Sequence, residues 1–218
     1  MKRPSTSSGQ RLVTAVLTAA LLWFYMFSPW TGGWPNFWVV MSCSAVILTT
    51  LGLSFTPDRK ELLKIEKPAL QILAGIVIAF ALWGIFWIGD KVSAWMFDFA
   101  RPQVENVYSM KAGLPPWTIA LLLLFLIGPA EEFFWRGYVQ RTLGKLLPGE
   151  HASDHAFLLT AAVYALVHVW SFNFMLVMAA LTAGLVWGLV YRLRPGWLPA
   201  LVVSHAVWDA LVFIIIPI

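Results

Sequence analysis

Long apolar stretches separated by short polar segments dominate the pattern of this chain of 218 residues. Seven of these stretches predict membrane-crossing helices, because a helix of about 20 mostly apolar residues spans the hydrocarbon core of a bilayer. We place the spans at residues 12–27, 37–55, 69–88, 117–143, 156–169, 175–191 and 198–216. The pattern therefore predicts an all-α, polytopic membrane protein with about seven transmembrane helices.

The segments between the predicted spans are mostly short. Residues 1–10 are polar and predict a disordered tail, and residues 58–67 form a charged loop. The longest connection, residues 89–116, contains the amphipathic stretch 92–99, for which we expect a helix lying along the membrane surface. A role for this stretch in gating a substrate is the alternative.

Composition supports a membrane protein and narrows its chemistry. Sixty per cent of the residues are hydrophobic, 12% are charged and the mean hydropathy is +0.75, whereas soluble domains carry about 25% charged residues. The net charge is +4, but the Lys and Arg residues do not form a basic stripe along the chain, so we expect no nucleic-acid partner. Cys43 is the single cysteine, which excludes an intrachain disulfide and a cysteine-based metal site.

The placement of the cations predicts the orientation in the membrane. With the N-terminus in the cytosol, eleven Lys and Arg residues fall in cytosolic segments, three fall in outer loops, and Arg136 lies within a span. Cytosolic loops of membrane proteins are enriched in Lys and Arg. We therefore predict an integral protein of a bacterial-type inner cell membrane, with the N-terminus in the cytosol and the C-terminus outside.

Three ionisable residues interrupt the fourth predicted span: Glu131, Glu132 and Arg136. Charged groups at bilayer depth are costly and usually functional. Glu132 and Arg136 are four residues apart on one helix face, so we expect them to form an ion pair. Glu131 is rotated by about 100° from Glu132 and would stay available. A purely structural ion pair is the alternative, but it leaves the second glutamate unexplained.

Two later spans carry the polar groups that could meet Glu131. His168 ends the fifth span one turn after Tyr164, and His205 and Asp209 lie one turn apart in the seventh. Counting about 1.5 Å per residue from the predicted helix ends gives depths compatible with a single site. We therefore expect these side chains to form one intramembrane site.

This set of groups suits hydrolysis of an amide by activated water. A carboxylate removed from bulk water is a competent base near neutral pH, and a neutral imidazole beside it can help to polarise water. Further donors can hold the oxyanion that forms when a carbonyl is attacked. The chain has no Gly-x-Ser-x-Gly motif, and Ser204 points about 100° away from His205. A zinc hydrolase remains an alternative, although the chain has no His-Glu-x-x-His motif.

These residues resemble the motifs of the CPBP family, the glutamic intramembrane proteases that include CAAX-type prenyl endopeptidases and bacteriocin-processing relatives. The Glu-Glu-x-x-x-Arg motif of the family is matched by residues 131–136. Its Phe-x-x-x-His motif is matched by Tyr164 to His168, with Tyr in place of Phe, and its His-x-x-x-Asn/Asp motif by His205 to Asp209. The resemblance covers about residues 115–216. It implies a four-helix catalytic core at residues 117–218, which follows a tail at 1–11 and accessory helices with a surface segment at 12–116.

The resemblance also implies a role for each residue. Glu131 and His168 would activate the water and His205 and Asp209 would face the oxyanion, with structural support from Glu132, Arg136 and Tyr164. The family resemblance implies no cofactor and no metal. An ionised aspartate only accepts hydrogen bonds, so Asp209 is expected either to be protonated or to orient His205.

We therefore predict an intramembrane endopeptidase that cleaves a membrane-anchored protein or peptide near the cytosolic leaflet of the lipid bilayer. A non-enzymatic scaffold or immunity protein with the same fold is an alternative, and so is a proton-coupled carrier. The short chain without an inverted repeat argues against a carrier. The presence of every catalytic-type residue argues against a dormant site.

Overall fold

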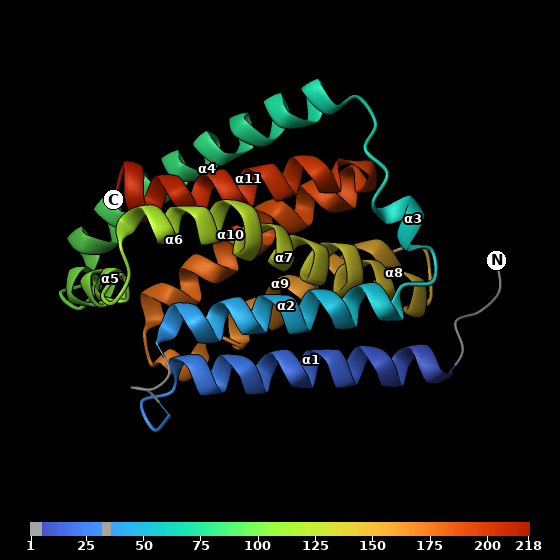
Figure 1. The fold of residues 1–218 in the computed structure, drawn as a ribbon, viewed down its shortest axis with the longest axis horizontal. Helices are drawn as coiled ribbons and strands as arrows, with labels where there is room; N and C mark the ends of the chain where they lie inside the picture. The colour runs from blue at the N-terminus through green and yellow to red at the C-terminus, as the bar shows by residue number, and fades with distance from the viewer. Residues whose placement is uncertain (1–5, 32–35) are drawn as a thin grey trace.

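The computed structural model describes residues 6–31 and 36–218, and every regular element within these ranges is helical. Seven helical segments in them are long and apolar enough to cross a membrane. They run back and forth and form one bundle (Figure 1). The predicted fold class, an all-α polytopic membrane protein, is thus confirmed.

The elements follow the predicted order. The first three spans are α1 (Thr6–Phe27), α2 (Phe37–Phe55) and α4 (Pro68–Met96), with the short helix α3 (Arg59–Leu62) before α4. The fourth span is the composite helix Pro116–Leu146, made of α6 (Pro116–Leu122), η1 (Leu123–Ile127), α7 (Gly128–Glu132), η2 (Phe133–Gln140) and α8 (Arg141–Leu146). The last three spans are α9 (Ala152–Leu166) with η3 (Val169–Ser171), α10 (Phe174–Leu193), and α11 (Leu198–Ala210) between η4 (Pro195–Trp197) and η5 (Leu211–Ile215).

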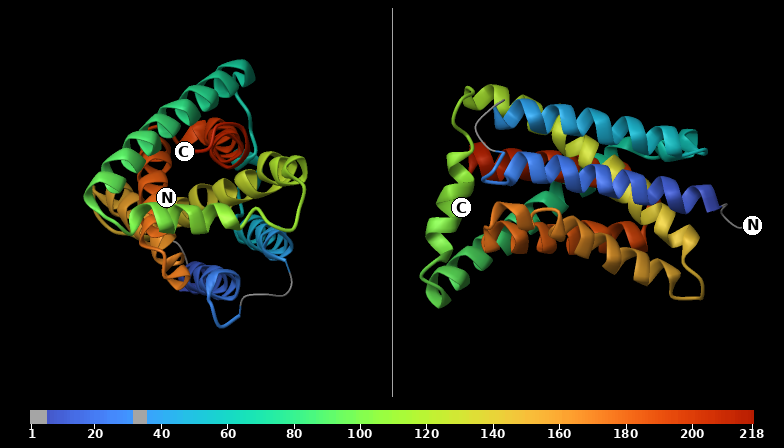
Figure 2. Two further views of the ribbon diagram at one scale, coloured as in Figure 1. Left: turned by 90° about the vertical axis from the view of Figure 1, so that its left-hand side faces the viewer. Right: turned by 90° about the horizontal axis from the view of Figure 1, so that it is seen from below.

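Two of the predicted boundaries are wrong. The first helix begins at Thr6, so residues 6–10 are helical and not part of a disordered tail; residues 1–5 of that tail lie outside the described residues. The stretch 92–99 is not a separate helix, because residues 92–96 are the end of α4 and residues 97–99 form the turn before the next helix. No proline interrupts either segment, so the helical hydrogen bonds extend beyond the apolar window. The helix that runs across the end of the bundle is instead α5 (Ala100–Ser109) (Figure 2).

The fourth span departs from a regular α-helix on both sides of its acidic centre. Both η1 and η2 are π-helical. The wider turn of η1 brings the amide of Gly128 to the carbonyl of Leu123. Widened turns of this kind often accompany functional sites, and here they bracket the two glutamates.

Small residues let the helices that carry the site approach closely. A Cβ atom on Gly128 of α7 would lie 2.8 Å from backbone atoms of Ala206 in α11, so only glycine fits there. Likewise, α4 packs on α11 where a Cβ on Gly75 would lie 2.5 Å from the carbonyl oxygen of Ala200. The first of these contacts places the acidic centre of the fourth span beside the turn of α11 that carries His205.

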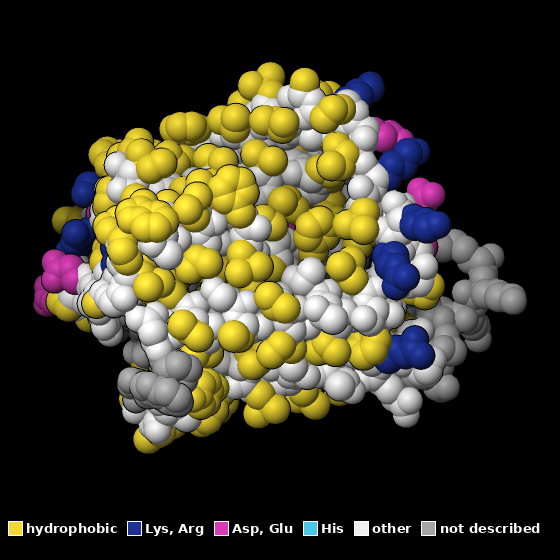
Figure 3. Space-filling view, viewed as in Figure 1, with side chains coloured by type: hydrophobic (Ala, Val, Ile, Leu, Met, Phe, Trp, Pro, Cys, Tyr) yellow, Lys and Arg dark blue, Asp and Glu magenta, His cyan; other side chains and the backbone are white. Residues whose placement is uncertain are grey.

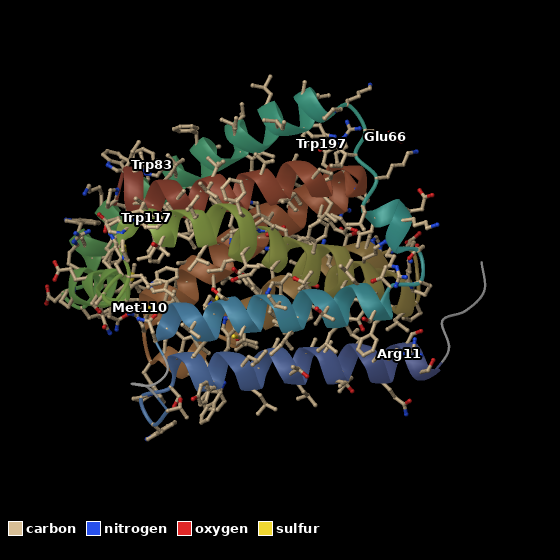
Figure 4. The ribbon with its side chains drawn as sticks, viewed as in Figure 1. Arg11, Glu66, Trp83, Met110, Trp117 and Trp197 are labelled. Carbon is tan, nitrogen blue, oxygen red and sulfur yellow. The ribbon has the colours of Figure 1, made fainter. Side chains whose placement is uncertain are left out.

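The bundle has two distinct ends. Trp83 lies toward the end where α5 is found, here called the α5 end, whereas Arg11 and Glu66 lie at the opposite, N-terminal end (Figure 4). Between the two ends the visible surface is largely hydrophobic (Figure 3). At the N-terminal end Arg141 donates to both carboxylate oxygens of Asp58, at 2.6 and 2.5 Å, and these hydrogen bonds lower the pKa of Asp58. This contact ties the loop after α2 to α8.

Candidate active site

A buried ion pair ties the acidic centre of the fourth span to α11. Arg136 donates from Nη1 to Oε1 of Glu132 at 2.7 Å, as the four-residue spacing predicts. The same Oε1 lies 2.8 Å from Nδ1 of His205. Glu132 is 0% exposed and Arg136 is 1% exposed, so each charge depends on the other for compensation. Oε1 of Glu132 therefore links the fourth span to α11, whereas Oε2 is buried and has no hydrogen-bond partner among the described residues.

Glu131 is bonded to α9 instead. The hydroxyl of Tyr164 donates to Oε2 of Glu131 at 2.7 Å, and both side chains are buried. Tyrosine supplies this hydroxyl at the position where the resembled motif has phenylalanine, which has none. The bond fixes one carboxylate oxygen and leaves Oε1 as the oxygen that can accept from water.

Both ring nitrogens of His168 are engaged. Nδ1 lies 2.7 Å from the carbonyl oxygen of Tyr164, which requires the proton to be on Nδ1. Trp23 of α1 donates its indole N–H to Nε2 at 3.0 Å. The imidazole is thus neutral, with its lone pair on Nε2 covered by Trp23. The sequence pattern does not single out Trp23, because a tryptophan in an apolar helix is normally interpreted as packing.

His205 is oriented by Glu132 and not by Asp209. Its Nδ1 is bonded to Glu132, and its Nε2 lies 3.6 Å from Oδ2 of Asp209, which is too long for a hydrogen bond. Trp187 of α10 stacks on the imidazole, with 3.9 Å between the ring centroids and 22° between the planes. In this structure the hydrogen bond that can orient His205 is therefore made to Glu132, and the role of Asp209 stays a prediction.

A cavity of about 460 Å³ brings the predicted residues together. Its lining includes five of them, from the fourth, fifth and seventh spans: Glu131, Tyr164, His168, His205 and Asp209. Most of the remaining wall is apolar and comes from α1, α2, α4, α5 and α10. The volume is typical of ligand sites, which measure about 300–1,000 Å³. In the described ranges, no group of three His, Cys, Asp or Glu side chains is placed to hold a metal ion.

The cavity lies in the half of the bundle next to α5. Its walls include the last residue of α1, the later part of α4, the first turns of α2 and α10, and α5 itself. The N-terminal end of the bundle lies on the opposite side (Figure 1). A cytosolic N-terminus would therefore place the cavity in the half of the membrane away from the cytosol, and an N-terminus outside the cell would place it toward the cytosol.

Comparison with protein families identifies the segment that carries this site. Residues 113–211 match the model of the Rce1-like family of type II CAAX prenyl endopeptidases. The matched segment contains every predicted site residue, whereas α1, α2 and α4 precede it. Comparisons with curated proteins and with solved structures gave no match. Over residues 113–211 the chain is therefore similar to the Rce1-like type II CAAX prenyl endopeptidases, in agreement with the resemblance of its motifs, and this similarity supports a CAAX-type intramembrane protease.

Proposed function

We propose that the protein is an intramembrane endopeptidase that hydrolyses a peptide bond of a membrane-associated protein or peptide, with water activated by Glu131. One observation carries the proposal: ionisable side chains from three spans converge on a single, largely apolar cavity. Such groups are costly within a membrane and usually functional. The family match over residues 113–211 supports the reaction class.

In the proposed mechanism Glu131 is the general base. Tyr164 occupies Oε2, so Oε1 is the oxygen that takes a proton from a water molecule in the cavity. The water oxygen attacks the carbonyl carbon of the scissile bond, and the carbonyl oxygen becomes an oxyanion. When the carbon–nitrogen bond breaks, Glu131 returns the proton to the leaving nitrogen. The products are a new carboxyl group and a new amino group.

The oxyanion is assigned to His205 and Asp209. Because Nδ1 of His205 is committed to Glu132, Nε2 is the nitrogen left for the cavity. It donates when the imidazole carries both protons, and a protonated Asp209 supplies a second donor. His168 can polarise the water only after Trp23 has left Nε2. While Trp23 covers Nε2 of His168, Glu131 is therefore the group that takes the proton from the water molecule.

The N-terminus is proposed to lie in the cytosol, as the Lys and Arg asymmetry favours. Hydrolysis then takes place in the half of the membrane away from the cytosol, since the cavity is next to α5. Reporter fusions at residues 1 and 218 should give opposite signals, with the first in the cytosol. The reverse pair of signals would place the cavity toward the cytosol instead.

The test of the function compares peptide termini in membranes that contain wild-type protein or the variant Glu131→Gln. The matched control is Glu150→Gln, which removes a carboxylate whose side chain is 88% exposed. Wild type and control should generate the same new termini, and Glu131→Gln should generate none while still folding. A synthetic peptide with the identified sequence should then be cleaved in liposomes.

Two results would contradict the proposal. Cleavage by Glu131→Gln at the wild-type rate would remove Glu131 from the reaction. Identical termini with and without the protein would favour the non-enzymatic scaffold. Elemental analysis of the purified, active protein decides between metal-free hydrolysis and the zinc alternative.

A further inference from the structure

We propose that Trp187 and Ser204 are positioning residues that hold His205 in place for the reaction; this rests on the proposed function. Neither residue belongs to the motifs that carry the family resemblance. Trp187 lies in α10, between the spans that carry the two site histidines. Ser204 directly precedes His205 in α11.

His205 needs a second contact besides Glu132. The bond from Nδ1 to Oε1 of Glu132 holds one corner of the ring, in the plane of the ring. An imidazole held by this bond alone can still turn about it and carry Nε2 away from the cavity. Trp187 prevents this rotation, because its ring lies nearly parallel to the imidazole at 3.9 Å between centroids. The hydrogen bond to Glu132 in the plane of the ring and the stacking of Trp187 on its face together set the position of Nε2.

The indole of Trp187 is itself held. Its Nε1–H donates to Oγ of Ser204 at 3.0 Å, and both residues are 0% exposed. Because Ser204 and His205 are neighbours, this bond ties the indole to the same turn of α11 that carries the imidazole. Ser204 and His205 thus hold the same indole from neighbouring positions of α11, one through its N–H group and the other across its ring.

Trp187 also contacts Arg136, the cation that forms the ion pair with Glu132. The guanidinium carbon of Arg136 lies 5.3 Å from the centroid of Trp187 and 5.1 Å from that of Tyr164. Both distances are within the range of a cation–π contact. Trp187 therefore touches both groups that bond to Oε1 of Glu132, namely Arg136 and His205. This double contact separates it from a buried tryptophan that only fills space.

The experiment compares Trp187→Phe and Ser204→Ala with the matched control Trp135→Phe. Trp135 is also 0% exposed, and its Nε1 has no hydrogen-bond partner among the described residues. Replacing it removes the same bulk from the same bundle, and its ring contacts are with Trp23, Phe134 and Tyr164 and not with His205. For each protein, kcat and KM are measured in liposomes on the substrate peptide that the comparison of peptide termini identifies. The side-chain ¹⁵N resonance of the His205 Nδ1–H is recorded without substrate and assigned with His205→Gln.

Trp187→Phe should lower kcat at least tenfold and Ser204→Ala about threefold to tenfold, the worth of one hydrogen bond. KM should stay within about twofold in both, since the reacting geometry changes and not substrate binding. The His205 Nδ1–H resonance should shift or broaden in both variants. Trp135→Phe should keep the resonance and lose less than about threefold in kcat.

Equal kcat losses in Trp187→Phe and Trp135→Phe, with an unchanged His205 resonance, would overturn the proposal. Ser204→Ala retains the indole ring and decides the question if Trp187→Phe does not fold. If the resonance responds as expected but wild type cleaves no peptide, the positioning is correct and the proposed function fails. If wild type is active but neither variant alters kcat or the resonance, the function stands and the positioning is refuted.

Discussion

Replacing Glu132 by Gln would remove one charge from the buried junction at the centre of the site. The change keeps the shape of the side chain but leaves the guanidinium of Arg136, 1% exposed, without its carboxylate. The amide oxygen can still accept from both donors at the position of Oε1, and its N–H₂ group takes the place of Oε2, which has no hydrogen-bond partner among the described residues. Breaking a buried ion pair by removing one partner costs about 3–5 kcal/mol. This corresponds to roughly a 150- to 5,000-fold change in the unfolding equilibrium.

A loss of that size is a large part of the stability of a folded protein, which is about 5–15 kcal/mol. Glu132→Gln should therefore reduce the yield of folded protein and lower its thermal unfolding temperature in detergent. Glu131→Gln is the control, because Glu131 is bonded to a tyrosine hydroxyl and not to a cation. It should unfold close to the wild-type temperature.

The double variant Glu132→Gln/Arg136→Met tests the cause. It removes both buried charges and keeps an unbranched side chain between the two aromatic rings, so it should recover at least half of the lost stability. If Glu132→Gln is as stable as wild type, Arg136 does not need the carboxylate of Glu132 to compensate its buried charge. If the double variant recovers nothing, the loss comes from the bond to His205 and not from the stranded charge.

The remaining predictions concern single contacts and are measured as kcat and KM on matched amounts of folded protein in liposomes. Asp209→Asn should keep turnover within about tenfold, or about 1.4 kcal/mol of barrier, because the amide is still a donor, whereas Asp209→Ala should lose most of it; equal losses would rule out the donor role. Tyr164→Phe removes the hydroxyl from Glu131 and should lower kcat about threefold to tenfold at constant KM, the worth of one hydrogen bond; an unchanged kcat would show that Glu131 needs no such support. Trp23→Phe uncovers Nε2 of His168 and should raise kcat by up to about tenfold, because the indole no longer competes with water; a decrease would show that the indole assists the reaction.

The sequence by itself predicted the seven spans, apart from some of their ends, and the ionisable residues of the fourth, fifth and seventh spans that line the cavity. Apolar length predicts the spans because the hydrocarbon core of a typical bilayer is about 30 Å thick, which a helix of about 20 residues crosses. Helical periodicity predicts the pair of Glu132 and Arg136, since residues four apart share a face. The cost of burying polar groups in a membrane identifies the remaining candidates, because few ionisable residues lie within the apolar spans.

Only the tertiary structure decided how these residues are connected. The bond between Glu132 and His205 joins residues 73 positions apart, and no spacing rule predicts it. Trp23 and Trp187 have no periodic signal that separates them from the other tryptophans, because an indole in an apolar helix can equally serve packing alone. Their partners depend on which helices cross and how closely, and close crossings require small residues on both sides, as at Gly128. The position of the cavity next to α5 likewise depends on the packing of helices that are distant in the sequence, so local pattern could not reveal it.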